Sequence, residues 1–500
     1  MKKIILILFF SSYIFAQPGS YDTTFSSDGI TTTCLSTTFF SLDGALQSDG
    51  KILSLGNSNL LNRLSLVRYN SNGSFDTSFG VSGVLANSVY SIFPSNRSYT
   101  LTSIAIQSDN KIVIAGYQNS DSFGYGFSVI RLLQNGAVDT TFNGTGYFEF
   151  FFGTIFGRAT CIKIQPDGKI IVAGTSGNAS ENFAMIRINA NGTLDTSFGT
   201  GGKVQTTFFN VESVAESIAI QPDGKIVLGG WTTNTPNGYD FALSRYSSNG
   251  SIDTTFGVNG KIVTTVNSFG SDLICKILLQ SDGKIIAGGL NNQTGGNYTL
   301  VRYLLNGTLD NTFGTNGIVV TPEASNFDMD IALQIDGKIV IAGGFNTDRF
   351  SYLRYLNNGQ LDTSFPIHGG YANVGLDGYA STVLIQPDNK IVICGSLTGE
   401  TNLCSLVVRL NPGPLLSNKE FEDNELVFYP NPTENVVSFD NSISQFQKAA
   451  IFNILGQKVG TITLKNLASE SIDLTGFSNG VYLIKLSNQN SLKTIKIIKK

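Results

Sequence analysis

The chain has 500 residues, enough for a large core and a second domain, and only 14% of them are charged, with a net charge of −4. This sparse and slightly acidic charge offers no basic surface for phosphates, so nucleic acid is excluded as an expected partner. The 54 glycines and 35 phenylalanines, against three methionines, indicate many short strands separated by turns.

The first 16 residues have the pattern of a secretory signal peptide. Lysines at positions 2 and 3 precede an apolar run from Ile4 to Phe10, and small residues follow up to Ala16, where we expect cleavage. The run is too short for a membrane anchor, and no other stretch of the sequence approaches spanning length. The sequence therefore predicts an exported chain with no transmembrane segment in its mature form.

Two motifs alternate seven times between residues 18 and 412. One contains an Arg, an Asn-Gly turn, an Asp eight residues after the Arg and a Phe three residues after that Asp. The other is Gln-x-Asp-Gly/Asn-Lys-Ile, whose Asp recurs at intervals of 52 to 60 residues. A period of that length is typical of solenoids, arrays and propellers. The Asp of the second motif stands at Asp49, Asp109, Asp167, Asp223, Asp282, Asp336 and Asp388.

One repeat contains four short strands. In the unit from Gly202 to Phe256 we expect them at residues 204–208, 217–221, 225–230 and 241–246. Four strands joined in sequence form an antiparallel meander, which is the blade of a β-propeller. We therefore predict an all-β fold, with a seven-bladed propeller of four-stranded blades over residues 18–412.

The Asn-Gly turn admits two registers. A two-residue turn on Asn249 and Gly250 would put Arg245 and Asp253 on opposite faces of the hairpin, whereas a three-residue loop ending at Gly250 would place them directly opposite each other. The constant spacing of eight favours the three-residue loop, because a cross-strand ion pair requires it. The predicted pairs are Arg68 with Asp76, Arg131 with Asp139, Arg187 with Asp195, Arg245 with Asp253, Arg302 with Asp310, and Arg354 with Asp362.

Arg409 and Asp22 are left over at the two ends of the array. Since a propeller is a closed ring, we expect these two residues to pair across its closure. The closure would place Tyr21 to Phe25 beside Val407 to Leu410.

The two motif turns should emerge on one face of the propeller, here called the constant face, and the connections of variable length on the other, the variable face. Aromatic residues on the variable face are our candidates for ligand binding. Trp231 and Tyr239 are expected in one Asn- and Thr-rich loop between the third and fourth strands of their repeat, and Tyr117, Phe123 and Tyr125 in another variable segment. The alternative is that these rings pack between blades.

Catalytic and metal sites have little support. His368 is the only histidine, so the sequence lacks an imidazole cluster for a metal. A calcium loop would need an acidic ligand where the turn ending at Asp76 has Arg68. Carboxylates found in single repeats, such as Asp240 and Asp272, leave a glycosidase-type pair open, although nothing fixes two of them at a catalytic separation. We assign no catalytic residue, metal or cofactor.

Five cysteines fall at unrelated phases of the repeat. We expect them to be buried thiols, and if a single bridge forms, Cys394 and Cys404 on adjacent strands are the best pair.

Both the repeat region and the C-terminal region resemble known families. The segments Asn191 to Gly199 and Ala219 to Gly230 resemble the delta-60 repeat of secreted bacterial proteins, a resemblance that covers residues 18–412 and implies a β-propeller without an assigned activity. After an expected linker at residues 413–425, residues 426–500 resemble a type IX secretion system type A C-terminal sorting domain, through Tyr429-Pro-Asn-Pro and the run from Gly480 to Lys485. Apolar alternation there predicts a small β-sandwich of about seven strands.

The sorting resemblance implies that the type IX secretion machinery is a partner, acting through residues 426–500, and that the domain is removed before release or attachment at the cell surface. We therefore expect a secreted or cell-surface propeller used for binding or adhesion, with an extracellular glycan or protein as ligand. The alternatives are a secreted glycan-acting hydrolase on a propeller scaffold, or a passive structural surface protein.

Overall fold

The structure is a computed structural model with side chains. It describes residues 17–35, 38–58, 63–86, 97–120, 124–209, 211–235, 238–267, 270–291, 296–322, 329–345, 349–365, 378–398, 403–413, 428–441, 446–453, 458–465, 467–488 and 492–500. The expected signal peptide and residues 414–425 of the expected linker lie outside these ranges, as does His368. No helix among the described residues is long and apolar enough to cross a membrane.

The chain divides into two compact units, residues 1–415 and 416–500. Seven antiparallel sheets, here called blades 1 to 7, make up the first unit. Blade 1 contains β2 (Phe40–Leu46), β3 (Ile52–Ser58), β4 (Arg63–Tyr69) and β5 (Val84–Ala86). Blade 2 contains β6 (Ser98–Ile106), β7 (Ile112–Ser120), β8 (Gly124–Leu132) and β9 (Tyr147–Phe150). Blade 3 contains β10 (Phe156–Ile164), β11 (Ile170–Gly177), β12 (Glu181–Ile188) and β13 (Lys203–Thr206).

The remaining blades follow the same order. Blade 4 contains β14 (Ser213–Ile220), β15 (Ile226–Thr235), β16 (Gly238–Tyr246) and β17 (Lys261–Thr264). Blade 5 contains β18 (Asp272–Leu279), β19 (Ile285–Asn291), β20 (Asn297–Tyr303) and β21 (Ile318–Pro322). Blade 6 has three strands within the described residues, β22 (Asp330–Leu333), β23 (Ile339–Phe345) and β24 (Arg349–Tyr355). Blade 7 contains β25 (Gly378–Ile385), β26 (Ile391–Thr398), β27 (Leu403–Leu410) and β1 (Ile30–Thr33).

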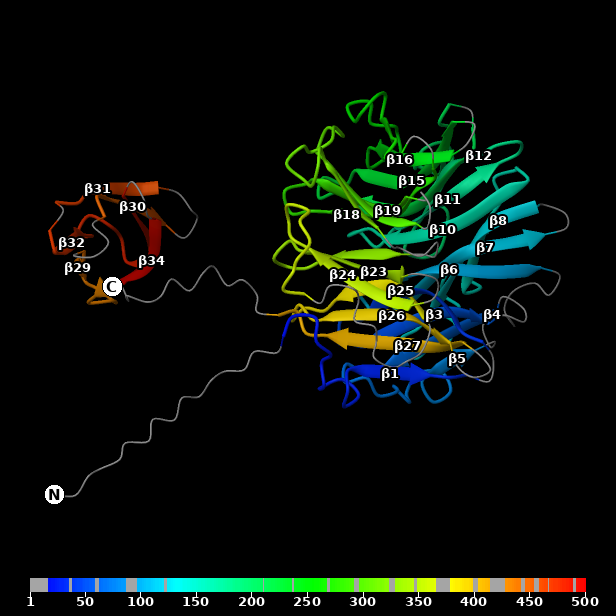
Figure 1. Cartoon of the computed structure of the whole chain (residues 1–500), viewed down its shortest axis with the longest axis horizontal. Helices are drawn as coiled ribbons and strands as arrows, with labels where there is room; N and C mark the ends of the chain where they lie inside the picture. Colours follow the sequence, from blue (N-terminus) through cyan, green and yellow to red (C-terminus); the bar gives the residue numbers. More distant parts are fainter. Residues whose placement is uncertain are drawn as a thin grey trace, which may run out of the picture. The chain divides into compact units, whose positions relative to one another are not determined.

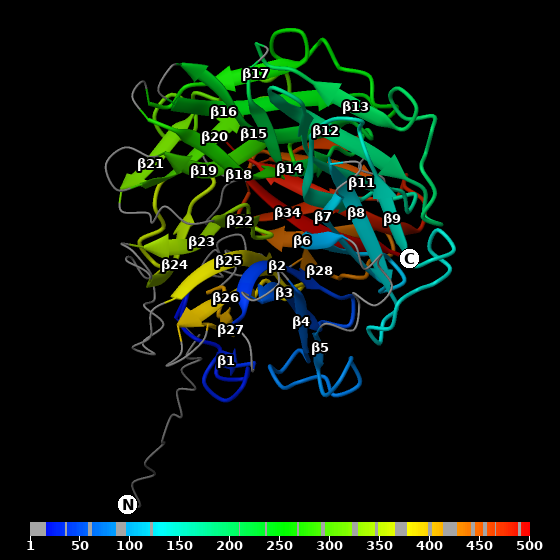
Figure 2. The same ribbon diagram turned by 90° about the vertical axis from the view of Figure 1, so that its right-hand side faces the viewer.

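The blades stand in a closed ring around one axis (Figure 2). The first strand of each blade, β2, β6, β10, β14, β18, β22 or β25, is innermost and contacts the first strand of the next blade, and β25 contacts β2. Apolar side chains fill the spaces between successive blades, as where Phe241 and Leu243 of blade 4 pack with Ile274 of blade 5. The predicted seven-bladed propeller is confirmed.

The blade boundaries differ from the expected ones by one strand. The expected first strand of the unit from Gly202, residues 204–208, overlaps β13, which pairs with β12 of the preceding blade. The reason is that the chain turns back directly after the Phe of each first motif, so the strand that follows this Phe pairs antiparallel with the strand that precedes the motif turn. In blade 4 the amide of Arg245 accordingly donates to the carbonyl of Gly260, at 3.0 Å. Local pairing closes a shorter loop than pairing with the following blade would.

The ring closes in blade 7, where β1 supplies the outermost strand (Figure 1). Ile30 pairs with Val408, and the Arg409 Nε donates to the Asp22 Oδ2 at 2.7 Å, which confirms the predicted pair. The expected pairing of Tyr21 to Phe25 beside Val407 to Leu410 was wrong in extent, because among those five residues only Tyr21 forms a bridge, with Leu410, and β1 pairs with Val407 and Val408.

A disulfide between Cys34 and Cys404 ties the N-terminal strand to the last blade, with a Cα–Cα distance of 4.3 Å. The expected partner Cys394 is wrong, and so is the expectation that all thiols are free. On β26 the residue opposite Cys404 is Leu397, whereas Cys394 lies opposite Val407. Cys34 follows directly after the pairing of Thr33 with Ser405.

The second unit contains two sheets, one of β28, β29 and β32 and the other of β31, β30, β33 and β34. Val437, Ile451, Ile472 and Ile484, from both sheets, are fully buried in one shared core. The strands are β28 (Phe428–Tyr429), β29 (Val436–Asp440), β30 (Lys448–Asn453), β31 (Lys458–Thr463), β32 (Ser469–Asp473), β33 (Gly480–Ser487) and β34 (Leu492–Lys499).

We predict that Cys34→Ser lowers the melting temperature of the propeller by several degrees, because the disulfide restricts the unfolded chain by joining residues 370 positions apart. A loss of roughly 2–4 kcal/mol in the free energy of unfolding is expected. Cys275→Ser, which removes an unbridged thiol, is the control. Scanning calorimetry with and without reductant measures the effect, and an equal response of the wild type and Cys34→Ser to reductant would contradict it.

Candidate functional site

In blades 1 to 6 each repeated Arg lies opposite its Asp across a three-residue loop. In blade 4 the amide of Ser247 donates to the Ser251 carbonyl, and Gly250, at φ +89°, closes the loop, so Arg245 faces Asp253. The predicted register is confirmed. Gly250 is also required by packing, since an added Cβ would lie 3.0 Å from the Phe198 ring of the preceding blade.

The same ion pair occurs in all seven blades, with a nitrogen-to-oxygen distance of 2.7–2.9 Å. The guanidinium carbon of each Arg lies 4.3–4.8 Å from the ring centre of the Phe that follows the Asp. All the predicted structural pairs are therefore present, and an aromatic face supports each cation.

The guanidinium also reaches the neighbouring blade. Arg245 Nη1 donates to the Leu305 carbonyl of blade 5 at 2.5 Å, and Arg131, Arg187 and Arg302 make the equivalent bond. In blade 1 the equivalent acceptor is the Gln134 carbonyl. We call this arrangement of Arg, Asp, Phe and the next carbonyl the inter-blade clamp.

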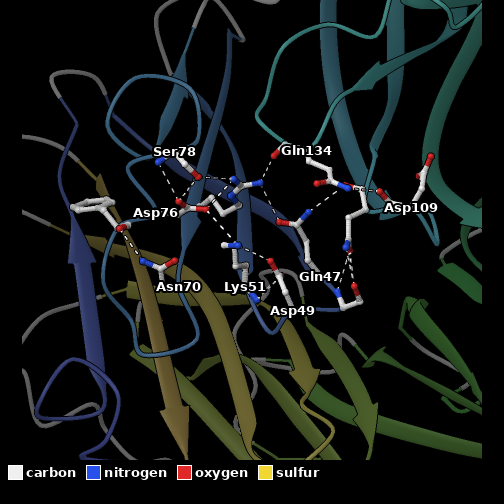
Figure 3. A network of polar contacts seen from close by, with 12 residues as sticks. Gln47, Asp49, Lys51, Asn70, Asp76, Ser78, Asp109 and Gln134 are labelled. Atoms are coloured by element: carbon white, nitrogen blue, oxygen red, sulfur yellow. Dashed lines mark hydrogen bonds and ion pairs between the residues drawn. The ribbon is translucent and has the colours of Figure 1, made fainter.

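Figure 3 shows the surroundings of the clamp in blade 1. Asp76 accepts a bond from Ser78 Oγ at 2.6 Å, and Lys51 lies between Asp49 and Asp76. Gln47 extends toward blade 2, and Gln134 donates to the Asp109 carbonyl at 2.7 Å. The second motif therefore supports the first, and these motif residues of the constant face are engaged in contacts within and between blades.

The hydrogen bond from the Thr255 hydroxyl, together with the Thr255 amide and Arg245, lowers the pKa of Asp253 to about 2 against the opposing effect of burial. A carboxylate whose folded pKa is depressed stabilises the fold above its ordinary pKa of 3.8. That stabilisation is lost as the pH falls from about 4 through about 2.

We predict that Asp253→Asn destabilises the propeller by roughly 3–5 kcal/mol at pH 7, because it leaves the buried Arg245 without its counter-charge. The deficit relative to the wild type should shrink as the pH falls from about 4 to 2. Lys225→Gln is the control, because Lys225 is 35% exposed and lies 3.5 Å from the same carboxylate, and a change under about 1 kcal/mol is expected for it. Urea unfolding at several pH values measures both, and equal effects of the two substitutions would contradict the clamp.

Polar side chains of the innermost strands join each blade to the next around the axis. The Asp43 Oδ2 accepts the Ile104 amide at 2.9 Å, and the Lys276 Nζ lies 3.2 Å from the Asp330 Oδ1, which raises the pKa of Lys276. These charged side chains thus serve contacts between blades. The other links are Thr102 to the Ala159 carbonyl, Thr160 to the Ala215 carbonyl, Ser217 from the Ile277 amide, Asp330 from the Val383 amide, and Thr382 to Asp43.

Two aromatic pairs stand at the variable face. Trp231 and Tyr239 have ring centres 4.4 Å apart, and Tyr117 and Tyr125 have ring centres 6.2 Å apart. All four side chains are half-buried, and Phe123 lies outside the described residues. The expected loop for Trp231 and Tyr239 was wrong, because β15 and β16 extend through this polar segment and pair up to Thr235.

The two pairs occupy equivalent positions in their blades. Trp231 and Tyr117 each follow the Lys of the second motif by six residues, and Tyr239 and Tyr125 each precede the Arg of the first motif by six. The five other blades have no aromatic residue at either position, but carry Asn57 and Asn62, Thr175 and Glu181, Leu290 and Gly296, Gly344 and Asp348, and Ser396 and Leu403.

An arginine joins the pair of blade 2. The Arg158 guanidinium, from β10 of blade 3, lies 5.1 Å from the Tyr125 ring centre and 5.6 Å from that of Phe156. Gly157 permits this approach, since a Cβ there would lie 2.7 Å from the Tyr125 carbonyl oxygen. The sequence alone did not identify Arg158 as a candidate site residue, because Arg158 lies outside the repeated motif. The sequence does carry a sign that Arg158 is unlike the motif arginines, because Pro166 occupies the position eight residues later, where the motif has an Asp.

Family comparisons agree with this architecture. A domain of unknown function (DUF5122) β-propeller model matches seven segments, and a secretion system C-terminal sorting domain model matches residues 427–500. The propeller of this chain is built from seven DUF5122 repeats. Both predicted resemblances are confirmed, and the sorting domain assigns this DUF5122 protein to type IX secretion, with a secreted or cell-surface location. The propeller matches are residues 47–79, 107–142, 165–198, 221–256, 280–313, 334–365 and 386–413.

Comparison with solved structures adds only distant similarities to the DUF5122 protein, and no curated protein matches it. The virginiamycin B lyase of Staphylococcus aureus is 11% identical, with 76% of this chain and 98% of that chain covered and a TM-score of 0.45. A PL25 ulvan lyase is 11% identical over 78% and 97%, with a TM-score of 0.44. The Trypanosoma rangeli sialidase is 10% identical over 97% and 87%, with a TM-score of 0.38. Similarity this low assigns no reaction.

Two carboxyl groups of the variable face, Asp240 and Asp272, are neighbours in the DUF5122 propeller. Asp272 is fully buried, and its Oδ2 accepts the amides of Val266 and Asn267 at 2.7 and 3.0 Å. Burial raises the pKa of Asp272 to about 6, and Asp240 adds to the rise. A buried carboxyl that caps its own connecting segment has a structural role. Among the described residues no three His, Cys, Asp or Glu side chains gather as metal ligands.

We predict that Asp272→Asn stabilises the propeller at pH 8 and has little effect at pH 4. A carboxyl whose folded pKa is raised gives its full stabilisation below its ordinary pKa of 3.8 and loses it as the pH rises through about 6. The difference at pH 8 should approach about 3 kcal/mol. Glu212→Gln, at an exposed position nearby, is the control. Thermal unfolding across this pH range measures it, and a difference that does not depend on pH would contradict the assignment.

Proposed function

We propose that the exported propeller is a binding or adhesion module that takes an extracellular glycan or protein on its variable face. The observation that carries the proposal is the occurrence of half-buried aromatic pairs at one equivalent position in blades 2 and 4 only. A ring needed for the blade fold would recur in every blade, as the clamp Phe does. Rings that depart from the repeat therefore favour a role that the repeat does not supply.

The surroundings of the pairs also favour binding. Ile155, next to Phe156, is 60% exposed, and Phe209, in the connection between blades 3 and 4, is 69% exposed with a left-handed φ of +51°. Exposed apolar side chains and backbone strain occur together at ligand sites more often than elsewhere. Aromatic rings of this kind contribute much of the free energy of binding at interfaces.

The hydrolase alternative would need two accessible carboxyl groups across a bound glycan. The neighbours Asp240 and Asp272 have the required chemistry, but both are buried, at 3% and 0% exposure. The passive structural alternative leaves the aromatic pairs without a role. A glycan array combined with a hydrolysis assay on the mature chain separates the three functions. Binding without turnover supports the proposal, turnover selects the hydrolase, and neither result selects the passive protein.

We predict that Trp231→Ala weakens binding of a glycan identified on the array by about 1–3 kcal/mol, because the substitution removes one ring of an aromatic pair. Titration calorimetry measures the affinity and thermal unfolding the stability. Val258→Ala, at an apolar position on the constant face that is 78% exposed, is the control. A large loss of melting temperature with unchanged affinity would show instead that the indole serves packing.

A chain that ends at Leu415 should accumulate in the periplasm as a folded propeller, because the sorting domain lies wholly beyond that residue. Cell fractionation and protease resistance test this expectation. Surface delivery of the shortened chain at the full-length level would contradict a role of residues 426–500 in export.

A further inference from the structure

We propose that Arg158, together with Tyr125, Tyr117 and Phe156, forms a recognition site for the acidic group of a polysaccharide, either a uronate carboxylate or a sulfate ester. This inference rests on the proposed binding function and names the chemical class of its ligand. It concerns the junction of blades 2 and 3 at the variable face, here called the Arg158 site.

The first observation is that Arg158 has no carboxylate partner among the residues that the structure describes. The other arginines with described side chains each have a carboxylate partner, Asp for the seven clamp arginines and Glu149 for Arg97. Arg158 is half-buried, and among the described residues no carboxylate lies within ion-pair distance of it. A partly buried cation without a counter-charge is favourably placed to gain one from a ligand.

The second observation is the way in which the guanidinium is held. Its carbon lies over the rings of Tyr125 and Phe156, whose ring planes differ by 22°. Stacking of this kind fixes the plane of the guanidinium while leaving its N–H groups at the edge free to donate. A planar fork held in advance matches the two oxygens of a carboxylate or sulfate, and less side-chain entropy is lost on binding.

The third observation is the aromatic surface beside the cation. Tyr117 extends the platform from Tyr125, and these rings are half-buried rather than sealed in the core. Aromatic planes pack well against the flat C–H faces of pyranose rings, so platform and cation together can bind the two parts of one acidic sugar. The second pair, Trp231 with Tyr239, stands two blades further on and has Leu273 where blade 3 has Arg158. An extended saccharide could therefore place an acidic unit at the first pair and any unit at the second.

Titration calorimetry on the mature chain tests the inference with three polysaccharide probes, polygalacturonate for carboxylates, carrageenan for sulfate esters, and a neutral β-glucan. We expect at least one acidic probe to bind more tightly than the neutral one, and the affinity to fall as the salt concentration rises. Arg158→Gln should weaken acidic binding about 10- to 100-fold, the range for hydrogen bonds to a charged group. Arg158→Lys, which keeps the charge and loses the planar fork, should show an intermediate loss and serves if Arg158→Gln does not fold.

Lys225→Gln is the matched control, because it removes one positive charge from a partly exposed position of the constant face and should leave all affinities unchanged. Equal binding of neutral and acidic probes with no effect of Arg158→Gln would overturn the inference, while an accompanying loss in Trp231→Ala would leave the proposed binding function standing. Arg158-dependent binding of poly-glutamate without binding of any acidic saccharide would overturn the saccharide assignment in favour of an acidic peptide. Failure of every acidic probe to bind would also overturn it.

Discussion

The ring depends on one buried guanidinium used seven times. Each clamp Arg pairs with a carboxylate in its own blade, stacks on the Phe that follows the Asp and donates to a carbonyl of the next blade. A single side chain thereby fixes both the register within a blade and the distance between blades. Because a buried charge without its partner costs several kcal/mol, neither the Arg nor the Asp can vary independently.

Because the clamp residues recur in every blade, the two faces of the propeller differ in how freely their residues can change. On the constant face, the turns, the Lys of the second motif and the clamp residues are committed to contacts within and between blades, and around the axis polar contacts such as that of Asp43 with Ile104 link neighbouring blades. The variable face carries no such repeated requirement. Changes there, such as the aromatic pair of Trp231 and Tyr239, therefore leave the ring intact, and new binding chemistry can arise without loss of the fold.

The sequence predicted whatever depends on a fixed spacing and missed what depends on assembly. The eight-residue interval required Arg245 to face Asp253, and the ends of the array required Asp22 to meet Arg409. Periodicity does not reveal which neighbour a strand joins, so the blade boundaries were shifted by one strand. The bond between Cys34 and Cys404 depends on ring closure across 370 positions.

At the candidate site, the amino-acid composition of one segment led to a wrong prediction of its secondary structure. The Thr- and Asn-rich segment after Trp231 has the character of a loop but pairs as a strand, because its partner near Tyr239 continues the ladder. The sequence shows that Arg158 lacks the Asp of the repeated pairs, but its stacking on rings from two blades appears only in the structure. The central claim, that the repeats form the scaffold and departures from the repeat form the site, is tested most directly by hydrogen exchange with and without a bound oligosaccharide. Protection confined to residues 117–125, 156–158 and 231–239 is the expected result, whereas protection of the Gln-x-Asp turns of the constant face would contradict the claim.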